Sequence, residues 1–185
     1  MIQDVLANAK DRMAKAEEAL KRELASIRTG RASPTLVDHI RVDYYGTSTP
    51  LNQLATVAAP EARLLTIQPW DRKALAAIEK ALQKSDLGLN PNNDGSLIRL
   101  VIPQLSEQRR KEMTKLVQKR VEESRVAARN IRRDGQDELK KLEKGKEVSE
   151  DEHRRAADQL QKLTDQTIGN LERIGHQKEA ELLEV

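Results

Sequence analysis

The sequence predicts an α+β protein in which an elongated three-helix bundle carries a small inserted α/β domain. Two observations support this fold class. Apolar residues recur at helical spacing near both ends of the 185-residue chain, whereas the middle of the chain shows the alternation of short strands. Because one amphipathic helix cannot bury its apolar stripe alone, the helices from the two ends must pack against each other.

The apolar stripes define three helices and the domain bounds. The first stripe consists of Ile2, Leu6, Ala9, Met13, Ala16, Leu20, Leu24 and Ile27. Matching stripes return only after residue 106. They consist of Met113, Val117, Ser124, Ile131 and Leu142, and then of Ala156, Leu160, Leu163, Thr167, Leu171, Ile174 and Leu182. We therefore assign residues 1–29 and 106–185 to the bundle and residues 30–105 to the insert, with two adjacent linkers between them.

Residues that start and stop helices set the expected helix ends. Gly30 follows the first stripe as a C-terminal cap, and Ser149 with Glu152 forms a capping-box pattern that opens the third helix. A second helix over residues 106–144 would be about 60 Å long at 1.5 Å per residue. Three glycines interrupt the two long helices at a cost of about 1 kcal/mol each, and the sequence offers no reason for them: Gly135, Gly169 and Gly175.

The insert shows the pattern of a small α/β domain. Ile40, Val42 and Tyr44 alternate with outward positions before a turn that contains glycine and proline, which indicates a half-buried strand. Asp71 is placed to cap a helix that extends through Ser85. Further strands are predicted at residues 51–57, 64–68 and 97–102.

Composition favours a reducing compartment and no membrane anchor. The 185 residues include no cysteine, so disulfides and thiolate metal sites are excluded. The N-terminal segment carries acidic residues and helical periodicity where a signal peptide has a basic start and a continuous apolar run. No apolar run reaches membrane-spanning length. We expect a cytoplasmic monomer.

The sequence offers no candidate for catalytic chemistry. The histidines, His39, His153 and His176, are scattered, and none has a second histidine or a cysteine at metal-ligand spacing. The paired carboxylates lie in helical runs typical of solvated surface, where desolvation would not raise a pKa. No catalytic residue, metal site or cofactor is therefore predicted, and an enzyme such as a small hydrolase is disfavoured.

Aromatic residues make up 2% of the chain, and the three present all lie in the insert. Trp70 is interpreted as covering the edge of a small core, although a binding anchor is the alternative. Tyr44 and Tyr45 are adjacent strand residues that face opposite ways, so they do not form one stacking platform. One of the two is expected to pack inward.

Charge is unevenly distributed, although the net charge is only +3. Residues 106–133 contain ten Lys or Arg against four Asp or Glu, whereas residues 147–185 contain five against ten. Within the second helix four arginines fall at i, i+4, i+7 and i+8, on one face without an interleaved lysine or acid: Arg125, Arg129, Arg132 and Arg133. Bidentate, permanently charged guanidinium groups suit phosphate recognition.

The simpler interpretation of this face is solvated surface, partly paired with acids of a neighbouring helix. Arg109 and Arg110 at the start of the same helix hint at a function, because the helix dipole disfavours cations there. We include both among the candidate RNA-binding residues. Solvated surface and an RNA- or phosphate-binding face are both open on these observations.

Several blocks of sequence together resemble the ribosome recycling factor family. Residues 27–34 are IRTGRASP, and Tyr44-Tyr45-Gly46 follows. The similarity continues through SDLGLNP at 85–91, PQLSEQRRK at 103–111 and ARNIRRD at 128–134. It extends over essentially the whole chain, and the combination of blocks is highly specific.

The resemblance implies an L-shaped, two-domain arrangement with an outline similar to transfer RNA. Members of the family act after translation termination. They bind the post-termination ribosome and, together with elongation factor G, promote subunit dissociation and release from mRNA. GTP hydrolysis would belong to that partner, which agrees with the lack of a GxxxxGKS or GxxxxGKT sequence in this chain.

The resemblance also implies roles for individual residues. The bundle would contact large-subunit ribosomal RNA through Arg132 first, with Arg129 and Arg133, and more weakly through Arg125 and Arg28. The inserted domain would meet elongation factor G and would swing on a hinge made by the two linkers, Gly30-Arg31 and Pro103-Gln104-Leu105.

One alternative comes from another class of protein. A helical scaffold or adaptor would bind partner proteins through the acidic third helix, and the basic face would only balance charge. Salt dependence distinguishes the RNA-binding interpretation from the scaffold interpretation. Counterion release weakens RNA binding steeply as the salt concentration rises, whereas binding through an apolar helix interface hardly changes with salt.

Overall fold

The computed structural model describes residues 1–27 and 29–183 and divides them into two compact units. One unit contains residues 1–27 and 108–183, and the other contains residues 29–107. The observed divisions fall after residues 27 and 107, two residues from the predicted ones in each case. Within the described residues, no helix combines the length and the apolarity needed to cross a membrane.

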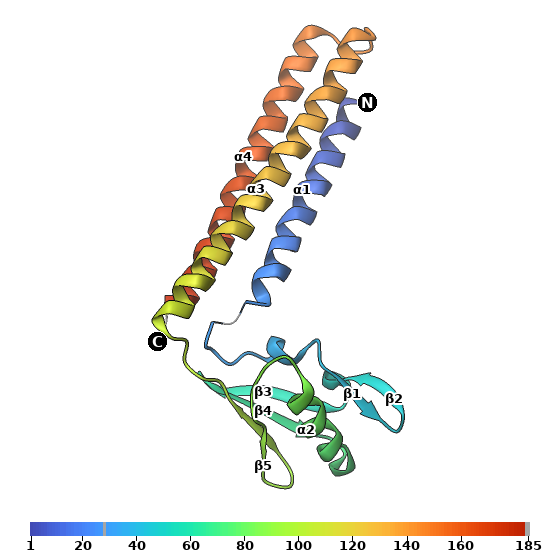
Figure 1. The fold of residues 1–185 in the computed structure, drawn as a ribbon. Coiled ribbons are helices and arrows are strands. Elements are labelled where there is room, and N and C mark those ends of the chain that lie inside the picture. Colours follow the sequence, from blue (N-terminus) through green and yellow to red (C-terminus); the bar gives the residue numbers. More distant parts are fainter. Residues whose placement is uncertain (28, 184–185) are drawn as a thin grey trace. The chain divides into compact units, whose positions relative to one another are not determined.

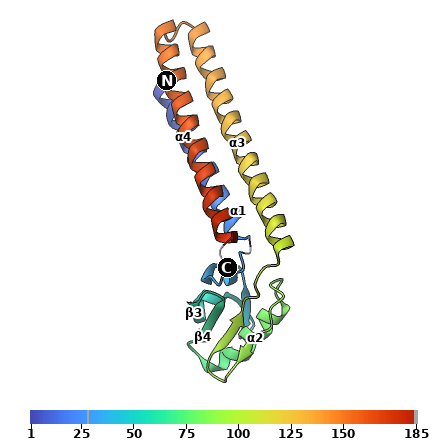
Figure 2. The same ribbon diagram turned by 90° about the vertical axis from the view of Figure 1, so that its left-hand side faces the viewer.

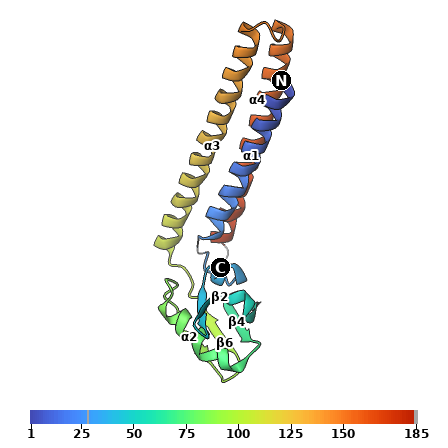
Figure 3. The ribbon, with the colours of Figure 1, turned by 90° about the vertical axis from the view of Figure 1, so that its right-hand side faces the viewer.

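The first unit is a bundle of three helices, as predicted. These are α1 (Ile2–Ala25), α3 (Glu107–Lys144) and α4 (Glu150–Leu183). The three run alongside one another in Figure 1, and the two views turned by 90° show α1 and α4 overlapping, with α3 beside them (Figure 2 and Figure 3). With 38 residues, α3 is about 57 Å long at 1.5 Å per residue.

The start of α4 agrees with the sequence prediction, whereas the end of α1 does not. Ser149 and Glu152 form the predicted capping box: the Glu152 N–H donates to Ser149 Oγ at 3.1 Å, and the Ser149 N–H donates to the Glu152 carboxylate at 3.4 Å. The predicted cap at Gly30 is wrong, because α1 ends at Ala25 and Ser26 occupies the C-cap position. Gly30 lies in the linker instead, with φ +75°.

The bundle core follows the predicted stripes with a shift in phase. In α3 the buried side chains include Val117 and Ile131 as predicted, but also Val121 and Leu139. Three predicted seam residues lie at the partly buried edge instead: Met113, Ser124 and Leu142. The predicted stripe followed one edge of the buried face, which at 3.6 residues per turn is centred nearer Val121 and Ala128. In α1, Val5 is buried, and Ile2 and Leu6 pack at its sides.

Two of the unexplained glycines mark places where α3 and α4 approach closely. A Cβ added to Gly135 of α3 would lie 2.8 Å from Cδ2 of Leu160, and one added to Gly175 of α4 would lie 2.6 Å from Cγ2 of Val121. Both distances are shorter than carbon atoms tolerate, so each glycine permits a contact that alanine would block. Gly169 has no atom within 4 Å of an added Cβ, and the packing gives it no role.

The second unit combines two sheets with one helix. An antiparallel hairpin pairs β1 (Arg41–Tyr44) with β2 (Thr47–Pro50). An antiparallel sheet of order β3-β4-β6-β5 consists of β3 (Ala55–Glu61), β4 (Leu64–Pro69), β5 (Asn92–Asn93) and β6 (Ile98–Val101). Three short 3₁₀ turns, at Pro34–Val37, Leu51–Gln53 and Arg72–Ala74, connect these elements, and the last leads into α2 (Leu75–Lys84).

Helix α2 and the four-stranded sheet share one core. Ile78 and Leu82 of α2 are buried with Leu65 and Ile67 of β4, together with side chains of β6. Asp71 is predicted to cap this helix, but it caps the 3₁₀ turn Arg72–Ala74 by accepting from the Lys73 N–H at 3.0 Å. Helix α2 itself begins at Leu75, with Ala74 in the N-cap position.

One predicted strand is wrong in its first half. Residues 51–53 form a 3₁₀ turn, and β3 begins only at Ala55. The Leu51 side chain is fully buried and its N–H donates to the carbonyl of Ile40, so the chain turns there to cover the core. The remaining predicted strands are confirmed within a few residues at their ends.

The prediction that one tyrosine packs inward is confirmed, but the prediction that the two face opposite ways is wrong. Tyr44 packs against the core and donates its hydroxyl hydrogen to Asp71 at 2.9 Å, whereas Tyr45 is exposed. The rings of Tyr44 and Tyr45 meet edge to face with centroids 4.5 Å apart, because Tyr45 follows β1 in a left-handed conformation with φ +51°.

The prediction for the tryptophan is also wrong. Trp70 is 66% exposed, and its indole N–H donates to Thr56 Oγ1 at 2.8 Å. Because Pro69 points inward at the end of β4, strand alternation turns Trp70 outward.

The helical glycines give a matched pair of stability predictions. Gly169→Ala should raise the free energy of unfolding by about 1 kcal/mol, because alanine is the better helix former and the added methyl meets no atom. Gly175→Ala should lower it, because crowding against buried Val121 costs about 1–3 kcal/mol. Urea unfolding followed by far-ultraviolet circular dichroism measures both. Equal stabilisation by the two alanines would show that the helices do not approach closely at Gly175.

Candidate nucleic-acid interface

The four predicted arginines of α3 lie on one flank of the helix, which we call the arginine flank: Arg125, Arg129, Arg132 and Arg133. Ala128 and Ile131, between them in sequence, are buried against the bundle. The helical repeat places Arg125 and Arg132 next to this buried stripe and places Arg133 farthest from it. The four guanidinium groups therefore have different surroundings.

Arg125 and Arg129 are neutralised within the bundle. Arg125 Nη1 lies 2.8 Å from one carboxylate oxygen of Glu122, and Arg129 Nη1 lies 3.4 Å from the other. Arg125 Nε also lies 3.5 Å from a carboxylate oxygen of Glu172 on α4, without hydrogen-bond geometry. Two arginines thus share acids from their own helix and from its neighbour.

As predicted, no lysine or acid is interleaved among the four arginines, but an acid borders the arginine flank on its N-terminal side. Glu122 lies three residues before Arg125 and seven before Arg129, which places it on the same flank. That spacing was available in the sequence and is the signal that would have identified it. Glu172 carries no such signal, because its position depends on how α3 and α4 align.

Arg132 faces a neutral partner instead of an acid. Its Nη1 donates to the side-chain oxygen of Gln161 on α4 at 3.4 Å, and the Gln161 amide donates to Asp165 at 2.8 Å. Arg132 Nε is buried and has no hydrogen-bond acceptor among the described residues. The stem of the side chain is therefore held against α4, while its positive charge meets no carboxylate in the described part of the bundle.

Arg133 is exposed, and no ion pair to it is found within residues 1–27 and 29–183. The acid that follows it in sequence, Asp134, is engaged elsewhere: its carboxylate lies 2.9 Å from Nη1 of Arg12 on α1. Arg132 and Arg133 together therefore present two adjacent positive charges that the described bundle does not neutralise.

The remaining RNA-binding candidates lie apart from the arginine flank. Arg110 precedes Arg125 by 15 residues along α3, which corresponds to about 22 Å. Arg109 pairs with Glu112 at 3.1 Å in the first turns of the helix. The structure does not bring these two residues together with Arg125–Arg133. Arg28 lies outside the described residues.

The predicted hinge residues occur where the two linkers touch. A Cβ on Gly30 would lie 3.3 Å from the backbone nitrogen of Leu105, so the left-handed glycine lets the linkers run close together. Backbone hydrogen bonds anchor the segments that follow and precede them: Ala32 N–H to Ala62, and Ile102 N–H to Arg63. Arg31, Pro103 and Gln104 belong to the same linkers.

Perturbed titrating groups have structural causes. The hydrogen bond to Asp71 raises the pKa of Tyr44 to about 12, and backbone hydrogen bonds from Ser96 and Leu97 lower the pKa of Asp94 to about 2. Asp94 closes the turn before β6, and Tyr44 ties β1 to the start of α2. No group of three or more His, Asp or Glu in the described ranges is arranged to hold a metal ion.

A three-helix bundle with an inserted α/β domain defines a class of two-domain α+β proteins, and here the bundle carries an unneutralised pair of arginines. Comparison with known proteins identifies the family. The family model described as "Ribosome recycling factor" matches residues 20–183. The chain belongs to the ribosome recycling factor family, whose members are translation factors.

Full-length relatives agree with this assignment. The chain is 57% identical to a ribosome-recycling factor of Dehalococcoides mccartyi and 58% identical to one of Roseiflexus castenholzii, over the whole of both chains in each case. A solution structure of a ribosome recycling factor, 43% identical, matches with a TM-score of 0.81 and covers 100% of this chain and 98% of its own.

A second structural match is a ribosome-bound factor. It is described as the Thermus thermophilus ribosome recycling factor, with Escherichia coli elongation factor G, on the E. coli post-termination complex. It is 48% identical over the whole of both chains, with a TM-score of 0.69.

The neutralisation of Arg125 and Arg129 predicts a gain of affinity for polyanions when Glu122 is changed. Glu122→Gln should release both guanidinium groups, so the variant should elute from heparin at higher salt than the wild-type chain. The matched control is Glu123→Gln, which removes the same charge but affects Arg120, a residue off this flank that also lies 4.0 Å from Glu23. Identical elution of the two variants would show that Glu122 does not mask the arginine flank.

Proposed function

We propose that this chain binds the post-termination ribosome and, together with elongation factor G, promotes dissociation of the subunits and release from mRNA. Membership of the family supports the proposal. So does the similarity to a recycling factor described, with elongation factor G, as bound to a post-termination complex. The contact with the ribosome is made to large-subunit RNA, and the protein acts as a monomer in the cytoplasm.

The observation that carries the proposal is the pair of adjacent, unneutralised arginines on α3. Phosphate oxygens accept hydrogen bonds from guanidinium groups in a bidentate geometry, so Arg132 and Arg133 can each engage a phosphate without first breaking an internal ion pair. Arg132 ranks first because its guanidinium group is already oriented by Gln161, which lowers the entropy lost on binding. Arg125 and Arg129 must give up Glu122 to bind RNA.

Recognition of folded RNA by such a face depends on backbone contacts. Contacts to phosphate and sugar fix the position of a protein on RNA, and the shape of the folded RNA does the selecting. The arginine flank carries no aromatic side chain for stacking on bases, since the three aromatic residues of the chain lie in the insert. The bundle is therefore suited to a shaped RNA surface and not to single-stranded bases.

The inserted domain has a different role in the proposal. It meets elongation factor G and moves on the hinge made by the two linkers. Gly30 has φ +75°, a conformation that a residue with a side chain adopts only with strain, and Pro103 restricts the other linker. GTP hydrolysis occurs on elongation factor G, and the chain supplies no catalytic group.

The proposal predicts a defect for Arg132→Ala in a reconstituted recycling reaction. With elongation factor G, GTP and post-termination complexes, the wild-type chain should split the subunits, which light scattering follows. Loss of one partly buried guanidinium that faces the RNA should raise the concentration needed for half-maximal splitting about tenfold or more. Arg155→Ala, which removes an exposed arginine of α4, should behave as the wild type. If Arg132→Ala matches Arg155→Ala, the arginine flank is not the ribosome-binding surface.

A hinge variant separates binding from splitting in the same reaction. Gly30→Ala places a methyl group against Leu105 at a positive φ, so it should leave large-subunit binding intact and slow the splitting step. Gly46→Ala is the control, because Gly46 has φ +78° but open space around it. Equal splitting rates for the two variants would contradict a hinge at Gly30.

A further inference from the structure

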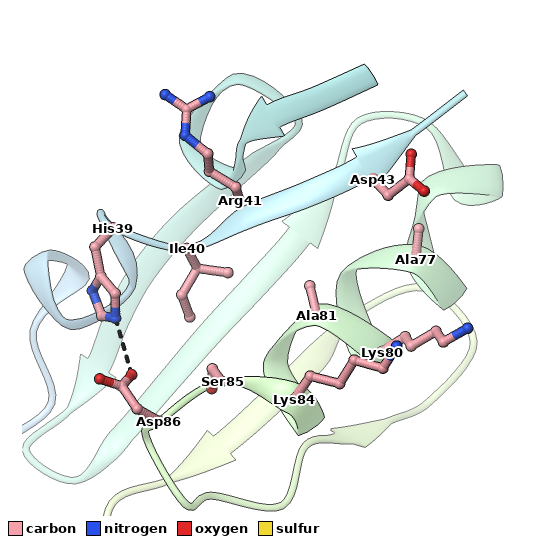
Figure 4. Close-up of a pocket in the computed structure, with 10 residues that line it drawn as sticks. All are labelled: His39, Ile40, Arg41, Asp43, Ala77, Lys80, Ala81, Lys84, Ser85 and Asp86. Atoms are coloured by element: carbon pink, nitrogen blue, oxygen red, sulfur yellow. Dashed lines mark hydrogen bonds and ion pairs between the residues drawn. The ribbon is translucent and has the colours of Figure 1, made fainter. Parts of the chain in front are cut away.

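The insert contains an open groove of about 590 Å³ between β1 and α2, which we call the β1–α2 groove. Figure 4 shows its two walls, with Ile40 and Arg41 on the strand side and Ala77 and Ala81 on the helix side. The volume is within the range of pockets that receive a ligand or a short peptide segment. All of its lining residues belong to the insert, so it is distinct from the arginine flank.

Small side chains create the hollow. Ala77 and Ala81 are one helical turn apart on α2 and face the same side, while Ile78 and Leu82 of the same helix are buried in the core. Ile40, which is 5% exposed, forms the apolar floor but does not fill the space. An apolar side chain from a partner would fit over these three residues.

Positive charge lines the groove and is not neutralised by the insert. Lys80 and Lys84 stand one turn apart on α2, and both are exposed. Neither has an ion-pair partner among the described residues. Arg41 makes a long hydrogen bond, at 3.5 Å, to the carbonyl oxygen of Ser48. Like charges at i and i+4 repel each other, so the fold gains nothing from this pair of lysines.

Two carboxylates restrict what the groove can bind. Figure 4 shows Asp43 at one end and Asp86 at the other, and Asp86 lies 3.2 Å from Nε2 of His39. Both would repel a nucleic-acid backbone, which carries a negative charge at every nucleotide. A peptide has isolated carboxylates for Lys80 and Lys84 and backbone N–H groups for the aspartates, so its chemistry complements both kinds of residue.

We propose that the β1–α2 groove binds an acidic segment of a partner protein, with carboxylates opposite Lys80 and Lys84 and an apolar side chain over Ala77 and Ala81. The inference rests on the proposed function, in which that partner is elongation factor G. It assigns the contact to one groove of the insert and states its chemistry: acidic groups spaced around an apolar residue.

Charge reversal in the groove tests the proposal. The full-length Lys80→Glu/Lys84→Glu variant should retain its fold, because both side chains are exposed and glutamate is as good a helix former as lysine. It should bind isolated large subunits as the wild type does, and it should need about tenfold or more elongation factor G for half-maximal subunit splitting. Lys80→Arg/Lys84→Arg keeps the charge and should restore the wild-type response.

The matched control is Arg63→Glu/Arg72→Glu, which makes the same change of charge elsewhere on the insert. The proposal is overturned if the groove variant and this control need the same concentration of elongation factor G for half-maximal subunit splitting. Loss of large-subunit binding without the factor also overturns it, because that result assigns the groove to RNA. If the wild-type chain itself binds no large subunits, the proposed function fails, which is a different outcome from a failure of the groove.

Discussion

The contact of α3 with α4 at two glycines is the constraint on which the availability of the arginines depends. At two levels a glycine replaces a larger side chain: Gly135 lies against Leu160, and Gly175 lies against Val121. The apolar stripes of the two helices meet around these points, where Leu160 is fully buried and Val121 is 4% exposed. This contact fixes the rotation of α3 about its own axis, and that rotation decides which side chains border the core.

The same rotation determines which positive charges are available to a partner. Once the seam of α3 is fixed, Arg125 and Arg132 lie at its edge and reach α4. There Arg125 meets an acid, Glu172, whereas Arg132 meets an amide, Gln161. An acid neutralises a guanidinium group, and an amide only orients it. A contact that exists for packing thus separates arginines that are neutralised within the bundle from arginines that are not.

Much of this organisation could be predicted from the sequence, because its signals are local. The three stripes, the capping box at Ser149 and the strand around Val42 depend on residues a few positions apart. The exposure of Trp70 could also be predicted from strand alternation, since Pro69 takes the inward position. The roles of Gly135 and Gly175, and the partners Glu172 and Gln161, could not be predicted, because they depend on the alignment of two helices. Glu122 was predictable from its spacing of three to Arg125.

The most direct test of this account is co-sedimentation of the purified chain with isolated large ribosomal subunits across a series of salt concentrations. Binding should be saturable and should weaken steeply with salt, as counterion release from RNA requires. The Arg132→Ala/Arg133→Ala variant should bind more weakly and reduce the slope of log affinity against log salt by about 1.8. Binding that hardly responds to salt, or a slope unchanged in the variant, would contradict an RNA interface at the unneutralised arginines.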